Sequence, residues 1–492
     1  MTEEATGIRI RPQEIDIPKN DPFENDLLGR KEPIEILTRL VRTLEGPTVL
    51  AVDASWGNGK STFVRIWAEY LRKRGFPTVE FNAWKTDYTR DPFSALSSEL
   101  MEGLGGTNAD DPIAEKLAKL KEAGKEVLRR SVPGVVRLAT AGILDISPLL
   151  EQELGQVLAS FAEKRLTEYV ETQNSVRKFN AALKDAAKTL SASHEDRPLV
   201  IFVDELDRCR PSYSIELLEI AKHFFAVDHI VFVLAVNRAE LANSIKGQYG
   251  SEFDASGYLR RFIDIDFRLP DPDRRAFVSS IIAHTGLDES SQLRIGTSMA
   301  AHTSMGGILL AFFSLPILSL RRIAQAIHRL CLIFSVKGID SELEWLAVTT
   351  ALILRTIDPE LYYSFFRGDT TDLDAANTLF SKPEMNALRR SSEGVLFETM
   401  LIVAFHEFSA RKLKWLKKKD QAILSPLHSH YKGGPGLKRS EEVESHAQNV
   451  LSSVEEYRAY IEKAKKMQGD VFKVAVELLE LFSNHLVDER SD

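Results

Sequence analysis

The feature that most constrains the fold is a set of five short segments rich in Val, Ile and Phe, separated by helical patterns. These segments span residues 48–54, 78–84, 197–206, 229–237 and 262–270. Four of the five are nearly continuous apolar runs, which are typical of parallel strands covered by helices on both faces. Because parallel neighbours need crossover connections, the pattern predicts an α/β fold with a five-stranded parallel sheet.

Helical periodicity dominates the rest of the chain, and no further strand is expected after Asp271. The long stretch between the second and third strands is charged and periodic, which predicts a helical insertion. The predicted segments are an extended lead-in (1–25), a core in two parts (26–103 and 196–272), the helical insertion (104–195), a helical lid (273–360) and a helical C-terminal domain (361–492) with a loop at 431–440.

Composition excludes several classes of protein. The 492 residues are 44 % hydrophobic and 27 % charged, which is ordinary for a globular protein that folds without metals or disulfides. Two cysteines, Cys209 and Cys331, cannot build a disulfide framework and have no zinc-ligand spacing, so we expect a reducing cytoplasm. The net charge of −8 gives no general reason to expect a nucleic-acid partner, although a local basic patch could still exist.

No targeting or membrane-spanning segment is expected. The N-terminal residues are polar and acidic, unlike a signal peptide. The most apolar stretch of the insertion, residues 132–150, contains Arg137, Asp145 and two prolines, so it is not predicted to span a membrane. Amphipathic contact of this stretch with a membrane surface remains an alternative.

A phosphate-binding loop is predicted at "ASWGNGKS", residues 54–61, between the first strand and a helix. The stretch fits the pattern G-x-x-x-x-G-K-[ST] except at Ala54, which is acceptable if its φ is negative. Lys60 would reach the β- and γ-phosphates of ATP, and Ser61 would bind Mg²⁺. The alternative is a glycine-rich turn with a surface lysine. The predicted nucleotide-binding residues are Ser55, Trp56, Gly57, Asn58, Gly59, Lys60, Ser61 and Thr62.

Two carboxyl groups follow the third strand in "LVIFVDELDRCRP", residues 199–211. Asp204 is placed to hold the Mg²⁺ ion, and Glu205 to orient or deprotonate an attacking water. Two exposed acids at a strand end would be the ordinary interpretation. The phosphate-binding loop on an earlier strand makes that interpretation the weaker one.

Three further positions complete the predicted site. Asn237 follows the fourth strand and could hold the attacking water, cap the next helix, or do both. Arg260 and Arg261 precede the fifth strand, where an arginine could stabilise charge on a neighbouring subunit's γ-phosphate. Spacing alone favours cations at a helix C-terminus. A second pair, Arg321 and Arg322, could contact phosphate from the lid or lie on a solvated helix face.

These stretches together resemble the KAP family of P-loop ATPases, which are relatives of the AAA+ and STAND proteins. The resemblance covers residues 20–335 and rests on "DLLGRKEPIEILTRLV" (26–41), "FNAW" (81–84), "DPFSALSSEL" (91–100), "DELDRCRP" (204–211) and "YLRRFIDIDFRLPDPD" (258–273). It implies an ASCE-type core with ATP and Mg²⁺ as ligands.

The resemblance also implies roles for single residues. Glu205 corresponds to the catalytic base and Asn237 to the sensor, while Arg260 or Arg261 lies where related proteins carry an arginine finger. Arg321 or Arg322 lies near the lid's sensor arginine. Asp207 and Arg208 match the family signature and are expected to form an ion pair that orders the loop beside the γ-phosphate.

The resemblance implies a bacterial defence role. Many family members carry transmembrane helices where this chain has residues 104–195, so we expect a soluble member. Bacterial members are associated with anti-phage defence, the ATPase subunit of the Qat system among them. We therefore expect an ATP-hydrolysing switch or motor subunit that forms homo-oligomers or binds partner proteins of a defence complex.

Two other functions compete with that expectation. One is a nucleotide-gated scaffold that oligomerises and recruits an effector, with slow turnover. The other is nucleic-acid binding by "RKLKWLKKK" (411–419), where six cations surround Trp415. A solvated helix face is the ordinary interpretation of such a charge run and is favoured here.

Overall fold

The computed structural model describes residues 16–44, 46–104, 112–130, 155–223, 225–285, 305–337, 342–367 and 372–412, together with a few isolated positions. The chain divides into two compact units. The sheet unit runs from Ile15 to Asp271, and the helical unit combines Met1–Glu14 with Pro272–Asp492.

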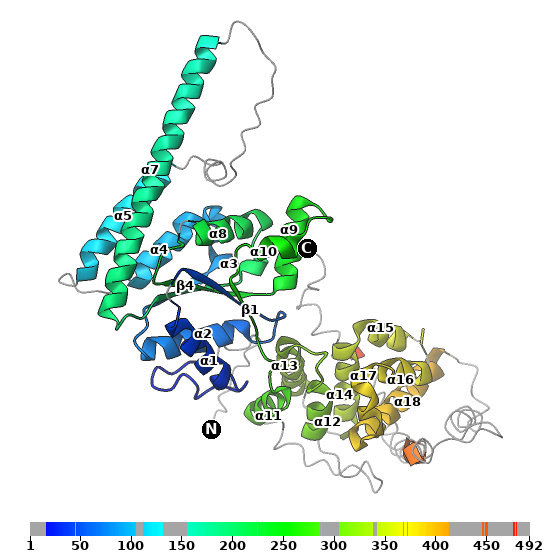
Figure 1. Ribbon diagram of the computed structural model, residues 1–492. Coiled ribbons are helices and arrows are strands. Elements are labelled where there is room, and N and C mark those ends of the chain that lie inside the picture. Colours follow the sequence, from blue (N-terminus) through cyan, green and yellow to red (C-terminus); the bar gives the residue numbers. More distant parts are fainter. Residues whose placement is uncertain are drawn as a thin grey trace, which may run out of the picture. The chain divides into compact units, whose positions relative to one another are not determined.

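A five-stranded parallel sheet forms the centre of the sheet unit (Figure 1). Its strands are β1 (Thr48–Asp53), β2 (Thr78–Asn82), β3 (Leu199–Asp204), β4 (Ile230–Val236) and β5 (Ile265–Arg268). They lie in the order β2-β3-β4-β1-β5, and every neighbouring pair is parallel. The predicted fold class is therefore confirmed. All five carboxyl ends meet at one edge of the sheet, which is where ligands of such sheets bind.

Helices cover both faces of this sheet, which is why the strands are continuously apolar (Figure 1). Alternate residues of a strand point to opposite faces. Leu50, Phe202 and Val233 pack on one face with α1 (Lys31–Arg42) and α2 (Lys60–Lys73). The residues that alternate with them pack on the other face with α4 (Pro92–Leu104), α8 (Pro211–His223), α9 (Arg238–Tyr249) and α10 (Ala255–Leu259).

The insertion contains two helices, α5 (Pro112–Arg130) and α7 (Gly155–Ser193), which lie side by side (Figure 1). Their direction is antiparallel, because Lys116 pairs with Asp185 while Glu126 lies beside Lys178. Their apolar faces extend the core that covers the sheet. The stretch 132–150 lies outside the described residues.

The strands are shorter than the sequence predicts, most clearly at β2. Residues 83–84 were expected to continue this strand, but they begin the short helix α3 (Ala83–Thr86), which leads into the 3₁₀ turn η1 (Asp87–Thr89). Asn82 ends the strand because its Oδ1 accepts a hydrogen bond from the Lys85 backbone N–H at 3.0 Å, a helix cap. A second 3₁₀ turn, η2 (Leu206–Arg208), follows β3.

The helical unit has no strand in its described residues. Its core contains Leu309, Phe312, Ile327, Leu352 and Phe397, all fully buried or nearly so. The helices are α11 (Arg274–Thr285), α12 (Met305–Phe313), α13 (Leu320–Lys337), α14 (Glu342–Ile357), α15 (Pro359–Arg367), α16 (Asp372–Phe380), α17 (Pro383–Asn386) and α18 (Ser392–Lys412), with the 3₁₀ turn η4 (Leu388–Arg390) before the last.

Candidate nucleotide-binding site

The loop at 54–59, where a phosphate-binding loop is predicted, joins β1 to the start of α2. Gly57 and Gly59 have φ of 76° and 84°, conformations that side chains disfavour. Ala54 still pairs with the sheet, because its N–H donates to the Val236 carbonyl at 3.3 Å and its φ is not positive. A methyl group is therefore acceptable at this position, because a backbone that continues the strand does not need glycine.

Arg30 holds this loop in place through hydrogen bonds, a role that sequence reasoning missed. Its side chain is 1 % exposed. The guanidinium donates to the Pro270 carbonyl at 2.6 Å and to the Asn58 carbonyl at 3.2 Å. The arginine thus ties the loop to the segment after β5. The stretch 26–41 was noted as a motif, but nothing local in the sequence indicates a contact with Pro270.

Lys60 is buried at the N-terminus of α2, with 8 % of the residue exposed. Its Nζ donates to the Ala54 carbonyl at 2.6 Å and lies 3.7 Å from Asp207 Oδ2. Burial lowers the pKa of Lys60, while Asp207, Asp204 and Asp53 oppose that shift. These carboxylates favour the charged form of Lys60 although it is buried. The ammonium group at the helix N-terminus could therefore bind an anionic ligand.

Asp204 ends β3 and adjoins the hydroxyl of Ser61. Burial raises the pKa of Asp204, and the neighbouring Glu205 charge raises it further. A hydrogen bond from Ser61 opposes the shift, and so does one from the Glu205 N–H at 2.8 Å. One hydroxyl and one carboxylate in contact match the protein ligands that Mg²⁺ takes when phosphates and water complete its shell. The donor set therefore fits this ion.

Glu205 follows in a strained backbone conformation, with φ of 60°. This turn directs its carboxylate to two partners: Oε2 accepts from Asn82 Nδ2 at 2.9 Å, and Oε1 lies 2.8 Å from Arg208 Nη1. A strained non-glycine residue at the end of a central strand is a common sign of a functional position. Asn82 was not among the predicted site residues, although its place at the end of β2 could have indicated it.

Asp207 is buried and contacts several groups of the site. It does not form the ion pair with Arg208 that was expected. Its side chain is 2 % exposed. Asp207 Oδ2 accepts from Trp56 Nε1 at 2.6 Å and from the Asn237 backbone N–H at 2.7 Å, besides facing Lys60. Successive side chains of a 3₁₀ turn diverge, so Asp207 points to the loop while Arg208 turns back to Glu205. One carboxylate thus joins the ends of β3 and β4 to the loop.

Asn237 caps α9, because its Oδ1 accepts from the Glu240 N–H at 3.4 Å. Arg260 and Arg261 are exposed beside β5, and Arg260 lies 3.9 Å from Asp254 in a loose surface pair. Their predicted contact with a neighbouring subunit stays a prediction.

Arg321 and Arg322 are exposed near the start of α13 in the helical unit. Their predicted contact with phosphate stays a prediction. Residues 413–419 of the predicted nucleic-acid segment and the loop at 431–440 lie outside the described residues.

A comparison with protein families decides the identity of this core. Residues 33–334 match the model described as the KAP family P-loop domain. The chain belongs to the KAP family. A further relative is the uncharacterized protein MJ0182 of Methanocaldococcus jannaschii, which is 30 % identical over 176 residues, or 32 % of this chain and 88 % of the relative.

Two solved structures that are similar to this chain come from Aeropyrum pernix and Pyrobaculum aerophilum. The ORC2 protein of Aeropyrum pernix, in ADPNP–ADP complexes, is 14 % identical with a TM-score of 0.33, over 89 % of this chain and 97 % of that one. Cdc6p of Pyrobaculum aerophilum is 10 % identical with a TM-score of 0.35, over 91 % and 97 %.

Among the described residues, no helix is both long enough and apolar enough to cross a membrane.

Proposed function

We propose that this chain binds ATP with Mg²⁺ and hydrolyses it in the sheet unit. The observation that carries the proposal is that four residues meet at one sheet edge. Lys60 lies at the end of the loop, Ser61 is hydrogen-bonded to Asp204, and Glu205 follows Asp204. A P-loop alone indicates only phosphate binding. A carboxylate next to the metal ligand adds the means to activate water.

Each residue has a role within this proposal. Backbone N–H groups of residues 57–61 and Lys60 hold the phosphates, while Ser61 and Asp204 hold the ion, which neutralises charge on the phosphate oxygens. Glu205 takes a proton from the attacking water, and Asn82 keeps its carboxylate oriented. Asn237 is assigned a place beside that water. Gly57 and Gly59 allow the backbone to approach the ligand.

The biological role proposed for this activity is a conformational switch or motor in a cytoplasmic bacterial anti-phage defence complex, such as the Qat type. Its support is the resemblance of the signature stretches. Homo-oligomerisation is part of this proposal, because the exposed Arg260 and Arg261 suit contact with a neighbouring subunit's nucleotide. The lid, insertion and C-terminal domain would transmit the change to partners.

A nucleotide-gated scaffold is the second candidate, and one observation favours it. One carboxylate oxygen of Glu205 already contacts Arg208, with 2.8 Å between Oε1 and Nη1, so that oxygen is not free to bind the attacking water. A site arranged in this way would bind ATP tightly and turn it over slowly until the Arg208 contact changes.

Two substitutions test these functions. Lys60→Ala should remove ATP binding, measured by titration calorimetry. Lys73→Ala, near the end of the same helix, should leave binding unchanged, since Lys73 contacts the Asn20 carbonyl instead. Unchanged ATP binding by Lys60→Ala would contradict the assignment.

Glu205→Gln should keep ATP binding and reduce hydrolysis by a factor of about 10²–10⁴, the usual contribution of a general base. If phage protection survives in a Glu205→Gln strain whose turnover is lost, the scaffold is the correct function. If protection is lost with turnover, hydrolysis is needed.

A further inference from the structure

The short segment after β2, residues 82–90, carries an exposed aromatic and cationic surface. Trp84 is 52 % exposed and Tyr88 is 79 % exposed, the two most exposed large hydrophobic side chains in the described part of the chain. Lys85 and Arg90 are exposed beside them. We name these four residues the aromatic surface. Tyr and Trp are also enriched among the residues with which proteins bind their partners.

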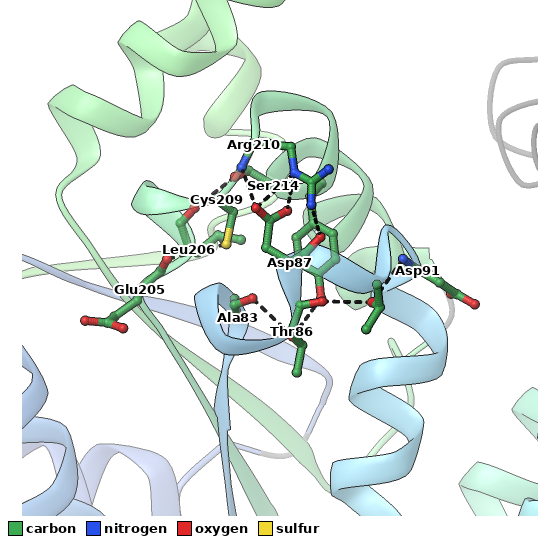
Figure 2. Close-up of polar contacts among 11 residues, drawn as sticks. Ala83, Thr86, Asp87, Asp91, Glu205, Leu206, Cys209, Arg210 and Ser214 are labelled. Atoms are coloured by element: carbon green, nitrogen blue, oxygen red, sulfur yellow. Dashed lines mark hydrogen bonds and ion pairs between the residues drawn. The ribbon is translucent and has the colours of Figure 1, made fainter. Parts of the chain in front are cut away.

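Two residues of this segment, Thr86 and Asp87, are anchored to residues at the start of α8 (Figure 2). Asp87 is held by Arg210, whose Nε lies 3.1 Å from Asp87 Oδ2 and whose Nη2 donates to the Asp87 carbonyl at 2.5 Å. The Thr86 and Tyr213 hydroxyls are hydrogen-bonded at 2.9 Å. Figure 2 shows Asp87 and Arg210 facing each other between α3 and the start of α8. The backbone of this segment is therefore ordered before a ligand binds, and the exposed side chains are what loses freedom on binding.

The charge of this region is positive although the chain is acidic overall. Lys85 and Arg90 are exposed, and the side chain of Arg208 is 25 % exposed. Asp87, the one acid within the segment, has a 13 % exposed side chain that is paired with Arg210, and Asp91, the next residue after the segment, accepts from the Ser94 N–H at 3.0 Å. With Arg210 and the Glu205 partner of Arg208 included, four cations lie near three acids. An anionic partner is therefore favoured over a basic or purely apolar one.

Two flat aromatic rings alternating with cations suit a particular anionic partner. Bases of single-stranded nucleic acid stack on exposed aromatic side chains while the phosphates meet lysine and arginine. An acidic peptide would satisfy the cations, but its carboxylates would not stack on the rings as nucleobases do. Duplex DNA keeps its bases stacked internally and cannot offer them.

Arg208 connects this surface to the proposed catalytic carboxylate. Its guanidinium carbon lies 5.5 Å from the centre of the Trp84 ring, within cation–π distance, and its Nη1 lies 2.8 Å from Glu205 Oε1. A base stacked on Trp84 would compete for the ring, and a phosphate would compete for the guanidinium. Either contact would weaken the hold of Arg208 on Glu205.

We propose that the aromatic surface binds single-stranded nucleic acid, and that binding releases Glu205 from Arg208 and so raises ATP turnover. The turnover part rests on the proposed ATPase function. The binding part does not, because it can be measured without nucleotide. A protein that fails to hydrolyse ATP yet binds the oligonucleotide at Trp84 and Tyr88 would overturn the function and leave the binding site in place.

Binding is tested on the full chain by fluorescence anisotropy with a labelled oligothymidylate of about 20 nucleotides, longer than one such surface covers. The expected affinity falls steeply as salt is raised. Tyr88→Ala should weaken it roughly tenfold, the usual effect of removing one stacking partner. Lys85→Ala should reduce the salt dependence. Tyr249→Ala, which removes a 50 % exposed aromatic of α9, should have no effect.

Three outcomes would overturn the binding site. One is the absence of oligothymidylate binding by a folded protein. The second is binding that Trp84→Ala and Tyr88→Ala leave unchanged, which would place the contact elsewhere. The third is stronger competition by poly-glutamate or by duplex DNA than by unlabelled oligothymidylate, which would assign the surface to an acidic protein or to duplex phosphates.

Coupling is tested by measuring ATP turnover at saturating oligothymidylate. Wild-type protein should be stimulated several-fold. Trp84→Ala, tested at oligonucleotide concentrations that saturate it, should show little further stimulation and a raised basal turnover, because its Arg208 has already lost the ring contact. Saturated binding with unchanged wild-type turnover would overturn the link through Arg208.

Discussion

At the scale of single residues, Asp204 shows how a proposed metal ligand lowers the stability of the fold around it. Burial and the nearby Glu205 raise its pKa, so the folded chain favours its protonated form. A raised pKa contributes stability only below the ordinary value near 3.8, and this stability is lost as the pH rises through the folded value. At neutral pH the ionised group therefore costs folding free energy.

Asp204→Asn should raise the melting temperature of the ligand-free protein, by about 2–4 °C for each kcal/mol recovered. The gain should be largest at neutral and alkaline pH and should shrink as the pH is lowered toward the ordinary pKa near 3.8. Magnesium-dependent hydrolysis should be lost in the same variant. Scanning calorimetry across this pH range measures the first effect, and a gain that grows on acidification would contradict the assigned sign.

Asp207 is the residue whose role sequence reasoning could least anticipate. Its partner Trp56 is 151 positions away in the chain, and the contact depends on the turn after β3 facing the loop after β1. The signature stretch indicated that Asp207 matters and suggested Arg208 as its partner. Geometry within the 3₁₀ turn decides otherwise, and no spacing rule carries that information.

Asp207→Asn should weaken ATP binding by about tenfold or more, because a buried charged acceptor for Trp56 and Asn237 contributes about 1.5–3 kcal/mol. Titration with a non-hydrolysed ATP analogue measures the change. Asp264→Asn is the matched control: this carboxylate accepts from the Val49 N–H at the opposite end of β1. The control should reduce stability without changing ATP affinity, and equal effects on affinity would contradict the role of Asp207.

At the scale of elements, the strands were predictable and their ends were not. Strands β1, β3 and β4 are buried on both faces, so their sequences are continuously apolar and need no knowledge of their neighbours. Where β2 ends depends on Asn82, which both caps α3 and holds Glu205. The site side chains could be chosen by strand-end position alone. Their partners required the three-dimensional arrangement.

Helix α7 of the insertion is packed into the core of the sheet unit. Phe179 is fully buried, with ring centres 5.1 Å from Phe93 and 5.5 Å from Phe225. Phe179→Ala should reduce the free energy of unfolding by about 3–5 kcal/mol. Val170→Ala, on the same helix at a 49 % exposed position, should change it little. Urea titration followed by circular dichroism compares the two, and similar losses would contradict the packing.

At the scale of the whole molecule, the chain divides into two compact units, each with buried apolar residues of its own, and the proposed nucleotide site belongs to the sheet unit. A ligand stabilises the unit that it binds, by about 2.7 kcal/mol at a hundred times its Kd. Calorimetry should therefore show two unfolding transitions, of which Mg²⁺ with a non-hydrolysed ATP analogue shifts the one assigned to the sheet unit. Lys60→Ala should remove the shift, and Phe179→Ala should identify the transition by lowering it. A single transition would mean that the two units unfold together. Equal shifts of both transitions would mean that nucleotide binding stabilises both units and not only the sheet unit.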